Sequence, residues 1–85
     1  MDQISNPQAA EQVQALVAWA ASHQTDVANA MASKWAMDTL AAATTQLSQV
    51  RVVAVRSLWA SGWSLADIHE ALGLSRARIH QIIEK

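Results

Sequence analysis

The sequence predicts an all-α fold, on the evidence of three observations. Alanine dominates the composition and is supported by leucine, glutamine and methionine, all good helix formers. Two glycines and one proline leave few of the turns that a β-rich fold needs. Apolar residues recur at helical spacing along most of the 85 residues. We expect one small domain of about five helices, at roughly 7–22, 26–44, 46–61, 65–72 and 76–84.

The first helix has a clear start, because Asn6 can cap it and Pro7 suits its first position. Its inward face is expected to hold Val13, Leu16, Val17 and Ala20. The polar run 22–26 weakens this pattern. Thr25 or Asp26 would cap a second helix there, or a single helix continues with a bend. The sequence leaves both readings open.

The second helix is predicted from Val27, Met31 and Trp35, which recur at four-residue intervals, with Leu40 continuing roughly the same side. This stripe predicts that Trp35 is a core residue. We place the end of the helix near residue 43 and a junction at 44–45, where two threonines follow each other.

The third helix carries two apolar stripes. The main one holds Leu47, Val50, Ala54 and Leu58 and ends at Gly62, where glycine suits the left-handed C-terminal position. The valines of 50–55 also suit a strand, but the helical period extends beyond them on both sides. The second stripe consists of Val52, Val55 and Trp59. It must be covered by the N-terminal helices or by another subunit. Because Trp19 also lies off its main stripe, the expected dimer interface comprises Trp19, Val52, Val55 and Trp59.

The last third of the chain has the pattern of a helix-turn-helix, a module whose second helix enters the DNA major groove. Ser64 caps a helix over 65–72, Gly73 makes the turn, and Ser75 caps a helix that starts at Arg76. The inward set is Leu65, Ile68, Leu72, Leu74, Ile79, Ile82 and Ile83. The outward set is Arg76, Ala77, His80, Gln81 and Glu84, with Arg78 towards the edge.

These residues resemble region 4 of the sigma-70 family, whose motif is Thr/Ser-Leu-x-x-Ile/Val, a turn, and Thr/Ser-Arg-x-Arg-Ile-x-Gln-Ile. The motif stands here at 64–68 and 75–82, within a similarity that covers about residues 47–84. The chain also looks like small stand-alone actinobacterial helix-turn-helix proteins. The resemblance implies base contacts by Arg76, Ala77, His80 and Gln81, and a supporting or phosphate-contacting role for Arg78.

Two positions depart from the family pattern. Ala77 and His80 stand where sigma factors typically carry an acidic residue and a further arginine, so we do not expect recognition of a promoter −35 element. His69 stands where the close approach of the two helices normally requires alanine or glycine. Either its side chain points outward from a slightly altered crossing, or the binding geometry differs from that of the family.

The outward residues suit contact with DNA. Arg76 can make paired hydrogen bonds to guanine, and Gln81 can do the same to adenine. Ala77 leaves room for a thymine methyl group, and His80 can donate to a phosphate or a purine N7. The helix N-termini at Ser64 and Ser75 offer backbone N–H groups to phosphate.

Composition narrows the class of protein. The net charge of −1 conceals a split between an acidic segment 1–50 and a segment 51–85 with five basic and three acidic residues. Cysteine is absent, and His23, His69 and His80 do not have metal-ligand spacing, so we expect no metal. No phosphate-binding glycine loop is present. Ser64 and Ser75 are better explained as helix caps than as catalytic nucleophiles. We therefore expect no cofactor, no enzyme activity, no membrane partner and a cytoplasmic, nucleoid-associated location.

The sequence thus predicts a specific double-stranded DNA-binding protein, a small transcriptional regulator that acts as a repressor. Residues 1–45 are expected to form a dimerisation scaffold and residues 46–85 the DNA-binding unit. A homodimer would place two recognition helices in successive major grooves, about 34 Å apart. The alternatives are a module that binds RNA polymerase or another transcription factor, an architectural or partition protein, and an ordinary helical hairpin.

Overall fold

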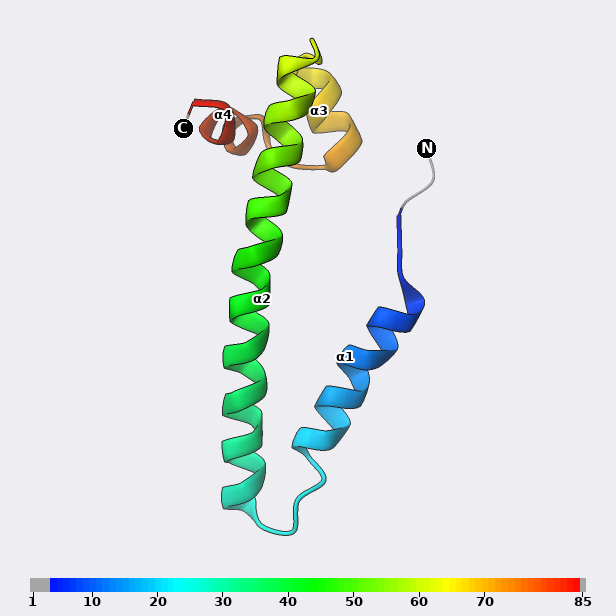
Figure 1. Ribbon diagram of the computed structural model, residues 1–85, viewed down its shortest axis with the longest axis vertical. Coiled ribbons are helices and arrows are strands. Elements are labelled where there is room, and N and C mark those ends of the chain that lie inside the picture. Colours follow the sequence, from blue (N-terminus) through cyan, green and yellow to red (C-terminus); the bar gives the residue numbers. More distant parts are fainter. Residues whose placement is uncertain (1–3, 85) are drawn as a thin grey trace. The chain divides into compact units, whose positions relative to one another are not determined.

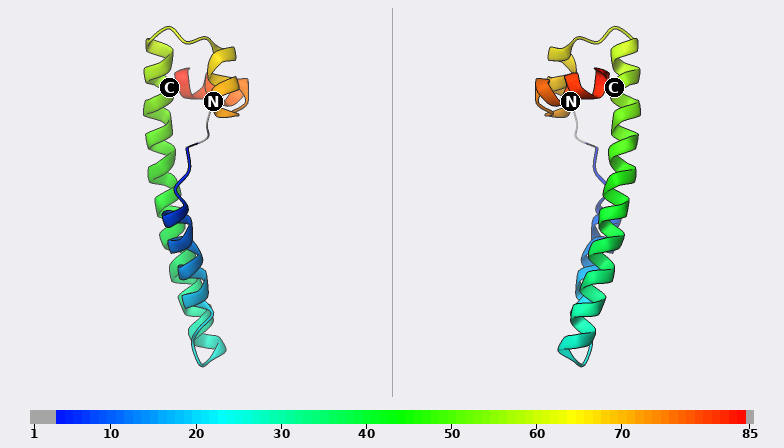
Figure 2. Two further views of the ribbon diagram at one scale, coloured as in Figure 1. Left: turned by 90° about the vertical axis from the view of Figure 1, so that its right-hand side faces the viewer. Right: turned by 90° about the vertical axis from the view of Figure 1, so that its left-hand side faces the viewer.

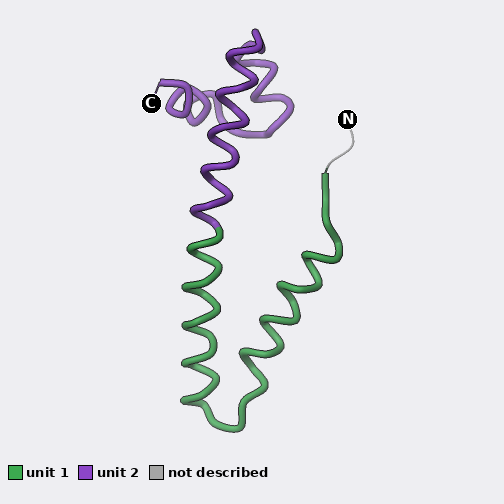
Figure 3. The backbone as a smooth tube through the Cα atoms, in the orientation of Figure 1, with its two compact units in different colours: residues 1–43 green, residues 44–85 purple. Residues whose placement is uncertain are grey.

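The computed structural model describes residues 4–84, and this part of the chain contains four α-helices and no strand (Figure 1). The helices are α1 (Pro7–Ala20), α2 (Asp26–Ala60), α3 (Leu65–Leu72) and α4 (Arg76–Glu84). The all-α prediction is therefore confirmed. Among the described residues, no helix is both long and apolar enough to cross a membrane. The chain divides into two compact units, residues 1–43 and 44–85, and the boundary falls within α2 (Figure 3).

Unit 1 contains two helices with a clear break between them. The side chain of Asn6 accepts a hydrogen bond from the backbone N–H of Ala9 at 3.0 Å and so caps α1. The helix ends at Ala20, two residues earlier than expected. Thr25 Oγ1 accepts from the backbone N–H of Ala28 at 3.1 Å and caps α2, with Asp26 in its first turn. The reading with two helices is therefore the correct one.

Among the described residues of unit 1, the buried side chains are the alanines Ala20, Ala32 and Ala36. The rings of Trp19 and Trp35 meet edge to face, with centroids 5.7 Å apart, and so join α1 to α2. Trp35 is nevertheless 57% exposed, and the prediction that it is a core residue is wrong. This part of α2 has two stripes with four-residue spacing, one of Val27, Met31 and Trp35 and one of Ala32 and Ala36, and either could face inward. The alanine stripe lies inside because small side chains allow two helices to approach closely.

The junction predicted at Thr44 and Thr45 is also wrong, because α2 runs through both residues without interruption. Threonine is only a mildly unfavourable helix residue, and no glycine or proline occurs between 26 and 60. Alanines precede the pair. Nothing in the local sequence therefore terminates the helix there.

Unit 2 packs α3 and α4 against the C-terminal part of α2, as Figure 2 shows from two sides. Its buried core consists of Val55, Ile68, Ile79 and Ile82. Partly buried side chains that pack against this core are Val52, Leu58, Leu65, Leu74 and Ile83. Most of the predicted inward set of the helix-turn-helix is therefore internal. Leu72 is an exception, at 45% exposed.

The turn after α2 has the hydrogen-bond pattern of a Schellman motif. The N–H of Gly62 donates to the carbonyl of Trp59, and the N–H of Trp63 donates to the carbonyl of Leu58, both at 3.1 Å. Gly62 has a φ of 98°, as expected for the left-handed position. This turn ends α2 and directs the chain into α3.

The assignment of Val55 to a dimer interface is contradicted, because its side chain is 0% exposed within the monomer. Val52 packs against the same core. Two members of the stripe we assigned to another subunit, Val52 and Val55, are thus covered within unit 2, whereas the third, Trp59, is 44% exposed. Leu47 and Val50, from the stripe expected to face inward, are each 66% exposed.

Candidate nucleic-acid interface

Both α3 and α4 begin with a serine cap. Ser64 Oγ accepts from the backbone N–H of Asp67 at 3.1 Å, and the N–H of Ser64 donates to the Asp67 carboxylate at 3.2 Å. This reciprocal pair is a capping box. Ser75 Oγ accepts from the backbone N–H of Arg78 at 3.1 Å. These caps fix where α3 and α4 start, and hence which residues lie on each helix face.

Between the two helices, Gly73 ends α3 in the left-handed conformation, with a φ of 72°. Its N–H donates to the carbonyl of His69 at 2.9 Å. The glycine is needed here because residues with a Cβ pay a steric penalty at such a φ. Leu74, the next residue, packs against the core and holds the turn down.

The two faces of α4 differ sharply in burial. Ile79 is 0% and Ile82 is 3% exposed, so one face is sealed against the body of unit 2. The opposite face exposes the four residues expected to contact bases: Arg76, Ala77, His80 and Gln81. Arg78 lies at the edge and is half-buried. Helical periodicity thus brings these side chains together on one accessible surface.

Polar contacts on this surface join neighbours within α4. The guanidinium of Arg78 donates to Gln81 Oε1 at 3.5 Å, at the long limit for a hydrogen bond. Nδ1 of His80 lies 3.1 Å from the carboxylate of Glu84, and both side chains are more than half exposed. Such solvent-exposed contacts contribute little to stability. They can therefore be exchanged for contacts with a ligand at small cost.

An anchor for α4 that sequence reasoning missed is Arg56. Its Nε–H donates to the backbone carbonyl of Ile82 at 3.0 Å, which links α2 to the last turn of α4. Carbonyls in the last turn of a helix have no partner within the helix, and a cation near them is favourable. The bond spans 26 residues of sequence, so no local signal could have revealed it.

His69, the departure from the family pattern, has an exposed side chain. Its Nδ1 lies 2.5 Å from the backbone carbonyl of Leu74 and donates to it in the tautomer that carries the hydrogen on Nδ1. The bulky ring thus points outward and reaches along the outside of the turn. It links α3 directly to the segment that leads into α4.

No protein-family model, no curated protein and no solved structure matches this chain significantly. The arrangement of the residues in unit 2 is therefore the main indication of function.

Proposed function

We propose that this protein binds double-stranded DNA in a sequence-specific manner through α4, and that it acts as a small transcriptional repressor. The observation that carries the proposal is the division of α4 into two faces. Ile79 and Ile82 are buried, while Arg76, Ala77, His80 and Gln81 are exposed together. A rigid helix with a polar outer face is the element that helix-turn-helix proteins insert into the major groove.

Each exposed residue has a definite role in this proposal. Arg76 donates two hydrogen bonds to O6 and N7 of guanine, and Gln81 reads adenine through N6 and N7. Ala77 leaves space at the surface of α4 for a thymine methyl group. His80 donates to a phosphate or a purine N7. The capped N-termini of α3 and α4 offer further N–H groups to the DNA backbone.

The modest charge of this part of the chain supports specific binding over indiscriminate binding. Residues 51–85 hold five basic and three acidic side chains, so general attraction for phosphate is weak. Two copies on an inverted repeat would double the number of contacts. We therefore include a homodimer in the proposal, with occlusion of a promoter as the simplest way for so small a protein to repress transcription.

The test begins with selection of bound fragments from random duplexes, followed by titration of the selected duplex and an unrelated one. The variant is Arg76→Ala with Gln81→Ala. The matched control is Arg51→Ala with Gln49→Ala, which removes the same residue types from exposed positions of α2. Both double variants lose one positive charge, so a general electrostatic effect is the same in each.

Two bidentate contacts at about 1–3 kcal/mol each predict a loss of at least about thirtyfold for the α4 variant on the selected duplex. The control should lose no more than a few-fold, and both should bind the unrelated duplex equally. Equal losses on the selected duplex would refute base reading by α4. Failure of the wild type to select any duplex would favour the alternative, a module that binds RNA polymerase or another transcription factor.

A further inference from the structure

Unit 1 carries an apolar surface that its own residues leave uncovered. Four large side chains form it, and we refer to them as the apolar flank: Trp19, Val27, Met31 and Trp35. Val27 is 70% and Met31 is 68% exposed, and the contact between the two tryptophans continues the surface from α2 onto α1. Tryptophan and methionine are enriched in protein interfaces, and tryptophan frequently dominates the binding energy.

The spacing of the flank on α2 is symmetric about Met31. Val27 precedes it by four residues and Trp35 follows it by four, which is about 6 Å along the helix axis in either direction. In a twofold interface, any residue i that contacts j must also be contacted by j of the other copy. An antiparallel copy with its axis at Met31 places Val27 opposite Trp35 twice. A small side chain then faces a large one at both ends.

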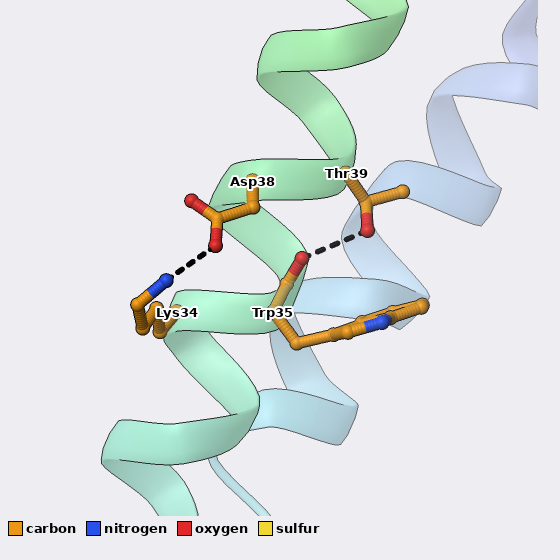
Figure 4. A network of polar contacts seen from close by, with 4 residues as sticks. All are labelled: Lys34, Trp35, Asp38 and Thr39. Atoms are coloured by element: carbon orange, nitrogen blue, oxygen red, sulfur yellow. Dashed lines mark hydrogen bonds and ion pairs between the residues drawn. The ribbon is translucent and has the colours of Figure 1, made fainter.

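The charges beside the flank do not oppose pairing of identical copies. Lys34 and Asp38 form an ion pair on α2, with Nζ and Oδ2 2.6 Å apart (Figure 4). The hydrogen bond that Lys34 donates to the Asp38 carboxylate, together with the negative charge of that carboxylate, raises the pKa of Lys34 above the usual lysine value. The opposite charges of Lys34 and Asp38 cancel, so this ion pair adds no net charge beside the flank. Two identical copies meet without the repulsion that a net charge would cause.

The exposed area is that of a weak dimer. A tryptophan can bury about 200 Å² and an aliphatic side chain about 100 Å², so the exposed fractions leave roughly 350 Å² of apolar surface on each copy. Homodimer interfaces are about 65% apolar, which implies about 1,100 Å² of total buried surface. This value lies at the lower end for specific complexes, in the range of weak and transient ones.

We propose that the apolar flank is the homodimer surface, with two α1–α2 hairpins joined antiparallel around Met31 into a four-helix arrangement. Antiparallel helices of this kind are typical of four-helix bundles. This inference specifies the surface through which the homodimer of the proposed function forms. The biological role of the dimer rests on that proposed function. It uses none of the residues proposed to contact DNA, so the two can fail independently.

The test is sedimentation velocity of the full chain without DNA, from one micromolar to several hundred micromolar. The variant Met31→Glu is compared with Met37→Glu, because both methionines are 68% exposed on α2 but only Met31 belongs to the flank. Circular dichroism establishes that each variant remains helical. Met31→Glu should raise the dimer dissociation constant at least about tenfold, since each dimer carries the charge twice, and Met37→Glu should change it less than about twofold.

A third measurement tests the position of the axis. Met31→Lys alone should be as monomeric as Met31→Glu, but an equimolar mixture of the two should form a heterodimer, because opposite charges then meet at the axis. A mixture that stays monomeric overturns the antiparallel arrangement around Met31. A monomeric wild type, or equal effects of the Met31 and Met37 variants, overturns the dimer surface. Loss of DNA selection with the dimer intact would count only against the proposed function.

Discussion

Ile79→Ala tests the claim on which the proposed DNA-binding surface depends, that buried isoleucines of α4 hold this helix against the rest of unit 2. Ile79 is 0% exposed and lies in a core of four buried side chains. The substitution removes three carbon atoms, at about 0.8 kcal/mol each, and leaves a cavity, so we expect a loss of about 3 kcal/mol. A unit of about forty residues has a stability of roughly 2–6 kcal/mol. The expected loss is therefore comparable to the entire free energy of unfolding of unit 2.

The assay is urea unfolding followed by tryptophan emission in a Trp19→Phe, Trp35→Phe background. In that background only Trp59 and Trp63 report, and both belong to unit 2. With a denaturant slope of about 1 kcal/mol per molar, Ile79→Ala should lower the urea midpoint by about 3 M or leave unit 2 unfolded in buffer.

Two control substitutions test whether the loss of unfolding free energy follows the burial of the isoleucine that is replaced. Ile83→Ala, at a half-buried position of the same helix, should cost about 1 kcal/mol. Ile4→Ala, at a fully exposed position, should change the unfolding free energy by less than about 0.5 kcal/mol. An unchanged midpoint for Ile79→Ala would refute the burial of this face of α4, and with it the exposure of the opposite face.

Two further substitutions test the anchor and the turn of α4. Arg56→Met keeps most of the side-chain stem but removes the donor to the Ile82 carbonyl. It should lower the unfolding free energy of unit 2 by about 1 kcal/mol in the same urea assay. An effect no larger than that of Arg51→Met would argue against the anchor. Gly73→Ala should cost about 1 kcal/mol, because its φ of 72° is unfavourable for alanine although open space surrounds the added Cβ. Gly73→Asn should cost less, since asparagine tolerates this conformation better, and equal losses would contradict backbone strain as the cause.

The bounds of α3, of the turn and of the start of α4 could be predicted from local sequence. Ser64, Gly73 and Ser75 make contacts with residues at most four positions away, so the positions of the caps and the turn follow from short-range rules. The helical period then decides which residues of α4 lie on the side away from Ile79 and Ile82. That is why the outward set was anticipated correctly.

The inward face of α2 could not be predicted in the same way. Trp35 belonged to a convincing apolar stripe, yet Ala32 and Ala36 are the residues that unit 1 buries. In unit 2, Val55 is buried and Val50 is exposed, the reverse of the expectation. A helix with apolar residues on several sides satisfies more than one packing arrangement, and periodicity alone cannot choose among them.

By itself, the sequence determined the all-α class, the capped starts of α1, α3 and α4, and the exposed polar side of the last helix, because each depends on interactions within a few residues. Only the tertiary structure decided which stripe of α2 is internal, where the ring of His69 goes, and that Arg56 fastens the end of α4. These outcomes depend on which surfaces the neighbouring helices offer, and on contacts such as Arg56 with Ile82 that join residues far apart in the chain.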